Sequence, residues 1–108
     1  MTKVFFDHLI SYTEIYELLE ISDSYERQEL EEIIDGIFHH HILDLILTRL
    51  PIEHHIEFIE LVARDPGHPG ILLFVKAKVD IDIEAEIKKH GEKVKAEVLS
   101  EIKKTRTR

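Results

Sequence analysis

The stretch that decides the fold spans residues 29–50 and reads ELEEIIDGIFHHHILDLILTRL. It is the longest strongly apolar periodic segment of the chain. At about 100° per residue, its first half places one set of side chains within a narrow arc, which is typical of an amphipathic α-helix. That arc holds Leu30, Ile34, Ile37, His41 and Leu45. We therefore expect a long central helix with His41 in the middle of its buried stripe.

Apolar residues lie all round the second half of this helix, after His41. A helix that is apolar on every side must be surrounded by protein, so this half is either wrapped by its own neighbours or buried against another copy of the chain. The second alternative predicts a partner interface, formed by Ile42, Leu43, Ile46, Leu47 and Leu50. Within the same helix, Gly36 suggests a close approach of a neighbouring helix, although a glycine without a packing role would look the same.

Capping and helix-breaking residues mark the ends of the central helix. Asp23 and Glu26 have the spacing of a capping box, so the helix should begin near Ser24. Pro51 ends it, because the residue before a proline is pushed out of the α conformation. The expected bounds are therefore residues 24–50.

Shorter helices are expected on both sides of the central one. Residues 2–21 have helical spacing and form one bent helix or two short ones, with Ser11 and Glu14 as a second capping box. Residues 51–64 form another helix, and a turn rich in proline and glycine follows it. On that helix one face carries four apolar residues and lies beside Phe58 and Val62. The four are Ile52, Ile56, Ile59 and Ala63.

Residues 75–87 alternate between apolar and charged side chains, which taken alone is a strand signal. Helical spacing also fits on either side of a break at Asp80 to Asp82. A single strand has no partner within the chain, so the strand interpretation requires two chains to pair across their edges. We expect a helix, a turn capped by aspartate, and a final helix from Asp82 to about Lys103. Gly91 is a candidate point of interruption in that last helix.

Length and charge limit the classes of function. The 108 residues suffice for one domain, expected at residues 1–102, followed by a basic, disordered tail at residues 103–108. The net charge of −8, from 22 acidic and 14 basic residues, argues against a nucleic-acid partner, because a phosphate backbone would be repelled. No apolar run approaches the ~20 residues of a membrane span, and nothing near Met1 resembles a signal peptide. The expected setting is cytoplasmic.

A family resemblance agrees with the helical interpretation. The run LLEISDSYERQELEEIIDGIFHHHILDLILTRLPIEHHIEFIELVARDP, then FVKAKV and IDIEAEIKKHGEKVKAEVLSEI, resembles a family of small uncharacterised bacterial all-helical proteins, a domain of unknown function. The resemblance covers about residues 18–102 and rests on leucine and glutamate patterns. It implies an all-α domain and favours helix over strand at residues 75–87, and it brings no activity, cofactor or site residue. The triple histidine and the segment at residues 67–70 depart from the family pattern.

The predicted fold class is therefore all-α, a small bundle of about four to five helices around the long central helix. Eight histidines then suggest a metal site as one possible function. Consecutive helical histidines point about 100° apart, so the three at residues 39–41 cannot all bind one ion. A site for zinc or another divalent transition metal would combine residues from the central helix and the helix after it. Its ligands would be His41, Asp44, His54 and His55.

Catalysis has less support in the sequence than binding. The chain has no cysteine, and its few serines lie at helix caps or on an exposed face rather than at a strand-to-helix turn. We therefore expect a non-enzymatic, cofactor-free interaction or structural module. Its expected partner is a protein, above all a second copy of this chain, bound through residues 42–50. The metal-binding bundle is the alternative.

Overall fold

Five α-helices make up most of the chain. The structure is a computed structural model and describes residues 4–20 and 24–106, a range in which no strand occurs. The helices are α1 (Thr13–Glu20), α2 (Ser24–Arg49), α3 (His55–Arg64), α4 (Gly70–Lys78) and α5 (Ile83–Arg106), with short 3-10 turns η1 (Asp7–Leu9) and η2 (Ile52–His54). The prediction of an all-α fold around a long central helix is confirmed. The predicted cap residue Asp23 lies outside the described residues.

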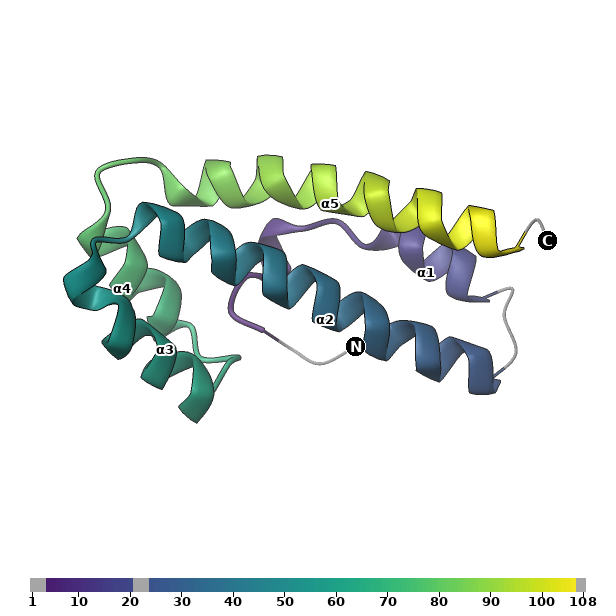
Figure 1. Ribbon diagram of the computed structural model, residues 1–108, viewed down its shortest axis with the longest axis horizontal. Helices are drawn as coiled ribbons and strands as arrows, with labels where there is room; N and C mark the ends of the chain where they lie inside the picture. Colours follow the sequence, from purple (N-terminus) through teal and green to yellow (C-terminus); the bar gives the residue numbers. More distant parts are fainter. Residues whose placement is uncertain (1–3, 21–23, 107–108) are drawn as a thin grey trace.

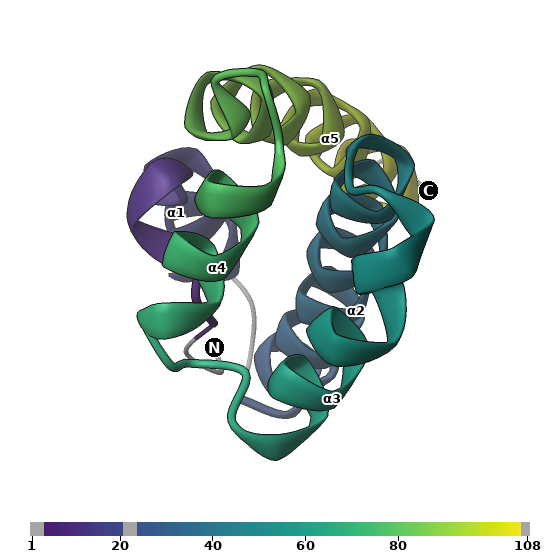
Figure 2. The ribbon, with the colours of Figure 1, turned by 90° about the vertical axis from the view of Figure 1, so that its left-hand side faces the viewer.

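The two longest helices set the shape of the molecule. In Figure 1, α2 and α5 run side by side in opposite directions along the long axis. Helices α3 and α4 pack on each other at the end where α2 stops, and α1 lies near the opposite end (Figures 1 and 2). The first turn of α1 is also linked by charge to the middle of α5, because Nζ of the buried Lys95 lies 4.0 Å from Oε1 of Glu14.

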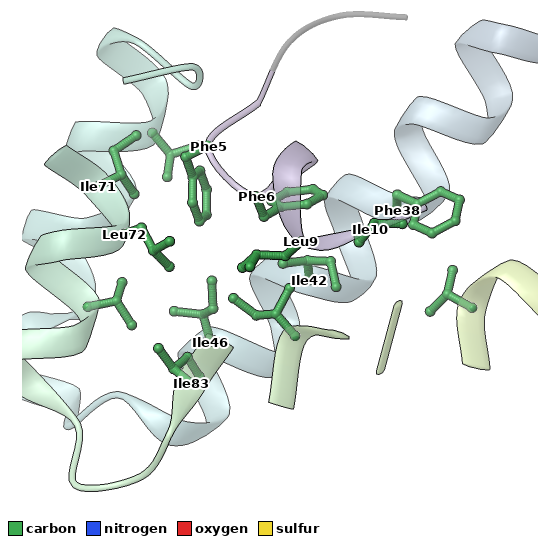
Figure 3. Packing of buried hydrophobic residues seen from close by; sticks show 14 of the residues in the cluster. Phe5, Phe6, Leu9, Ile10, Phe38, Ile42, Ile46, Ile71, Leu72 and Ile83 are labelled. Carbon is green, nitrogen blue, oxygen red and sulfur yellow. The ribbon is translucent and has the colours of Figure 1, made fainter. Parts of the chain in front are cut away.

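The N-terminal segment fills the centre of the bundle. Its buried residues Phe5 and Phe6 lie between α4 and α2 (Figure 3). The backbone makes a 3-10 turn at η1 and then extends at Ile10, so this region is not one bent helix. The Asp7 carboxylate explains the turn, since it accepts hydrogen bonds from the Val4 N–H (2.8 Å) and the Tyr12 hydroxyl (3.3 Å).

The buried stripe of α2 differs from the predicted arc. Its members recur every four residues and are almost wholly inaccessible: Ile34, Phe38, Ile42, Ile46 and Leu50. A row spaced by four winds around a helix by about 40° at each step, so successive parts of α2 face different neighbours. The expected arc through Ile37, His41 and Leu45 is only half-buried beside this row. The prediction that His41 lies in the middle of the buried stripe is therefore wrong, because Phe38 and Ile42 occupy that position.

The segment 75–87 forms a helix, a turn and a helix, as predicted. Helix α4 ends at Lys78, and the Asp82 side chain caps α5 by accepting a hydrogen bond from the Ala85 N–H at 3.2 Å. An ion pair between Lys76 and Glu84 spans the turn. The alternative strand is therefore wrong. Helix α5 also continues to Arg106, into the expected disordered tail, where cations favour a helix C-terminus.

The close approach predicted at Gly36 is found instead at Gly91, the glycine that was expected to interrupt α5. A Cβ placed on Gly36 would meet no atom within 4 Å, so no neighbouring helix approaches there. A Cβ on Gly91 would lie 2.8 Å from Cγ1 of Ile10. Helix α5 runs through Gly91 without interruption, and the missing side chain makes room for the buried Ile10. Close approach is thus the property of Gly91.

Alanine substitutions at these glycines should change stability in opposite directions. Gly36→Ala should raise the free energy of unfolding by about 0.5–1 kcal/mol, because alanine is the better helix former and the added methyl is unobstructed. Gly91→Ala should lower it by about 1–3 kcal/mol, because overpacking against Ile10 outweighs the same helix gain. Chemical denaturation of the two variants beside the wild type measures both. Stabilisation by both substitutions would contradict the described packing of Ile10 on α5.

Candidate interaction face

The five residues predicted to form the partner interface divide into two groups. Ile42, Ile46 and Leu50 belong to the chain's own core, where the first two are 0% exposed and the third 3%. They are therefore not accessible to a partner in this fold. Leu43 and Leu47 are half-buried at the surface. The apolar excess after His41 thus serves mainly the core, because α5 packs along α2 and the N-terminal segment lies against the same side of it (Figure 3).

Helix α3 turns its predicted apolar stripe outward. Ile56 and Ile59 are 74% and 52% exposed, and the neighbouring Phe58 and Val62 face the core instead. Ile52, in η2, is also exposed. Sequence reasoning placed these isoleucines on one face without including them in the interface. The available signal was that α3 is apolar on two sides, which one core cannot bury.

The exposed residues of α3 join those of α2 in a single apolar surface. A groove of about 330 Å³ runs between the two helices, lined by His39, Leu43, Leu47, Phe58, Ile59, Val62, Ala63 and Pro66. Ile56 lies one turn before Ile59 on α3 and extends the same surface. We call this surface the α2/α3 face, made of Leu43, Leu47, Ile56, Ile59 and Ala63.

Charged residues border the α2/α3 face along α3. Glu57 and Glu60 are exposed in the first two turns of the helix, and Arg64 is exposed at its end. Acid near the N-terminus and a cation at the C-terminus match the helix dipole. Helix α3 therefore has an acidic N-terminal end and a basic C-terminal end, and its apolar strip runs between the two.

The histidines do not assemble a metal site. Among residues 4–20 and 24–106, no three histidine or carboxylate side chains are placed to hold a metal ion. His41 faces α5, where its ring lies 5.9 Å from that of His90. His54 packs edge-on against Phe74 of α4, with ring centroids 6.2 Å apart. The described structure therefore does not bring His41, Asp44, His54 and His55 together as one metal-binding group.

His55 has a structural role at the turn after α2. Its Nε2 lies 2.7 Å from the Leu50 carbonyl oxygen. A carbonyl can only accept, so Nε2 carries the proton and donates to it. This bond satisfies a carbonyl at the end of α2, where helix geometry leaves the last acceptors without partners. His55 thus ties the start of α3 to the end of α2 and fixes the angle at which α3 leaves.

A further cleft contains polar side chains that are paired with one another or with the backbone. It measures about 750 Å³ between the N-terminal segment and α4, and Asp7, Lys76 and Glu84 are among its lining residues. The hydrogen bond from Lys76 lowers the pKa of Glu84 below its ordinary value, and the same bond raises the pKa of Lys76. Asp7 is occupied by its bonds to Val4 and Tyr12. The Lys76–Glu84 ion pair thus links α4 to the start of α5.

Comparison with known proteins adds no assignment. No protein-family model, curated protein or solved structure matches the chain. The resemblance to a family of bacterial helical proteins stays a prediction. Across the described part of the chain, every helix is too short or too polar to cross a membrane. The α2/α3 face is accordingly interpreted from its own chemistry.

Proposed function

We propose that this chain is a non-enzymatic protein-interaction module that self-associates through the α2/α3 face. The observation that carries the proposal is the pair of exposed isoleucines, Ile56 and Ile59, beside an apolar groove. Contiguous apolar surface on a folded domain costs solvation free energy and marks interaction sites. The proposed interface keeps Leu43 and Leu47 from the sequence prediction, and exposed residues of α3 replace the three residues of the core.

A second copy is the partner that suits the charges around this face. In a two-fold symmetric pair, the same surface contacts itself and two equivalent helices lie antiparallel across the axis. Antiparallel pairing of α3 would bring Arg64 of each copy towards Glu57 of the other. Opposite charges at the rim favour this orientation over the parallel one, which would place like charges together. The small apolar strip supports a weak dimer rather than an obligate one.

Sedimentation equilibrium over about 10 µM to 1 mM tests the proposal, since weak dimers dissociate in this range. The wild-type mass should rise from 12.7 kDa towards twice that value as concentration increases. Ile59→Asp should raise the dimer dissociation constant at least about tenfold, because it places a charge in an apolar contact. Ile59 is half exposed, so the variant should keep its helical circular dichroism.

The matched control is Leu73→Asp on α4. Leu73 is also apolar and 65% exposed, but it lies outside the α2/α3 face. This variant should dimerise like the wild type. Equal weakening by both substitutions would show a non-specific solubility effect, and a wild-type chain that stays monomeric throughout would contradict self-association.

A further inference from the structure

A second apolar groove runs along the other side of α2, between α2 and α5. It has a volume of about 450 Å³, and its lining combines Ile34 and Val98, which are buried, with Leu30 and Ile37, which are half-buried. Ile33 lines it as well and is 54% exposed. We call this the α2/α5 groove. It shares no lining residue with the groove between α2 and α3.

The shape of the α2/α5 groove suits the binding of a third helix between α2 and α5. Leu30, Ile33 and Ile37 follow one another at intervals of three and four residues, which is the spacing of one helix face. The two walls are antiparallel helices whose side chains form parallel rows. A third helix can place its own row of apolar side chains between such rows.

Among the described residues, both carboxylates that line the α2/α5 groove belong to α5, and no described lysine or arginine lines it. Glu97 and Glu101, one turn apart on α5, line it and are exposed. On α2, Glu29 is exposed one turn before Ile33. Among the described cations nearby, Lys95 is buried and pairs with Glu92 at 2.9 Å, and Arg27 of α2 pairs with Glu31 at 3.9 Å. Lys93 is exposed one turn before Glu97.

We propose that the α2/α5 groove binds an amphipathic helix of another protein whose apolar stripe is flanked by lysine or arginine. The apolar floor receives the stripe, and the glutamates on the rim attract the flanking cations. Rim charges of opposite sign mainly speed association and select the partner, while the buried apolar contacts hold it. The net charge of −8 acts in the same direction by drawing cationic partners and repelling acidic ones.

Two designed peptides test this groove. Each is a helix-forming sequence of about five turns with leucines at intervals of three and four, flanked by lysine in one peptide and by glutamate in the other. Fluorescence anisotropy should show binding of the lysine peptide alone, and added salt should weaken it. In isotope-labelled protein, the amide signals that shift on binding should cluster at residues 30–41 and 94–102.

Ile33→Gln and Ile59→Gln are the matched variants for this experiment. Both isoleucines are about half exposed. Ile33 lines the α2/α5 groove, and Ile59 lies on the α2/α3 face. Ile33→Gln should weaken binding of the lysine peptide at least about fivefold, whereas Ile59→Gln should leave it unchanged.

Four results of the peptide experiments would overturn the inference. These are absence of binding, equal binding of the glutamate peptide, signal shifts centred on the α2/α3 face, or equal weakening by both variants. Shifts in the groove on raising the protein concentration alone would also overturn it, since the occupant would then be a second copy.

Discussion

Replacing Phe6 by alanine should lower the free energy of unfolding by about 3–5 kcal/mol, the usual cost of removing a buried aromatic ring. Phe6 is 1% exposed, and its ring makes an edge contact with Phe5 at 5.2 Å between centroids. The ring also lies 6.5 Å from that of His39, so it links the N-terminal segment to α2. Urea denaturation followed by circular dichroism measures the loss.

His8→Ala is the control for this substitution. His8 lies in the same segment but is exposed, so its replacement should change the free energy of unfolding by less than about 0.5 kcal/mol. A loss below about 1 kcal/mol for Phe6→Ala would mean that the N-terminal segment does not form part of the core. Since a domain of this size is stable by only about 5–15 kcal/mol, the full effect removes a large share of the stability.

Ile46→Ala should cost about 2–5 kcal/mol even at concentrations where the chain is monomeric, because Ile46 is wholly buried in its own core. Its neighbour Leu47 is half-buried in the groove between α2 and α3. Leu47→Ala should therefore cost about 1 kcal/mol, in proportion to the smaller area removed from contact. Thermal or urea unfolding of dilute protein compares the two adjacent positions directly.

The reverse order of these two costs would contradict the orientation of α2. It would place Leu47 in the core and turn Ile46 outward, and the groove between α2 and α3 would then not exist as described. Equal costs would also count against it, since they would require both sides of the helix to be equally buried. The comparison thus decides which half of the predicted interface is core.

Sequence patterns predicted the helices better than they predicted the helix faces. The break between α4 and α5 was predictable because Asp82 can cap a helix with its own carboxylate, which is a local interaction. The face of α3 was not, because Ile56 and Phe58 belong to two apolar faces and only contacts with distant segments select the buried one. Periodicity identifies a face, whereas tertiary packing gives its direction.

The sequence marks the two helical glycines as unusual, but it does not reveal why a glycine stands at either position. Gly36 and Gly91 each interrupt a helical pattern with a poor helix former, and the sequence gives no sign of what lies opposite. The contact that matters is with Ile10, about eighty residues from Gly91 in the chain. Long-range contacts also explain why the N-terminal segment departs from a helix, since Phe5 donates its N–H to the carbonyl of Pro66 at 2.8 Å.

The candidate interface was predicted in part. Leu43 and Leu47 were identified from the apolar excess of α2 and lie on the α2/α3 face. The same excess also included core residues, because a helix that is apolar all round places some of these side chains in the core of a small domain and others at its surface. The four residues of the metal alternative do not come together in the described structure, for a different reason. Spacing along one helix can bring two ligands together, but the third and fourth depend on the angle between helices.

Self-association through the α2/α3 face is tested most directly by nuclear Overhauser effects between isotope-labelled and unlabelled copies of the wild-type chain. In such a mixture, filtered spectra report only contacts that cross from one copy to the other. We predict cross-peaks from the methyl groups of Ile56 and Ile59, growing with protein concentration. Intermolecular cross-peaks confined to other surfaces, or none at concentrations near 1 mM, would contradict the proposed interface because even weak dimers are populated there.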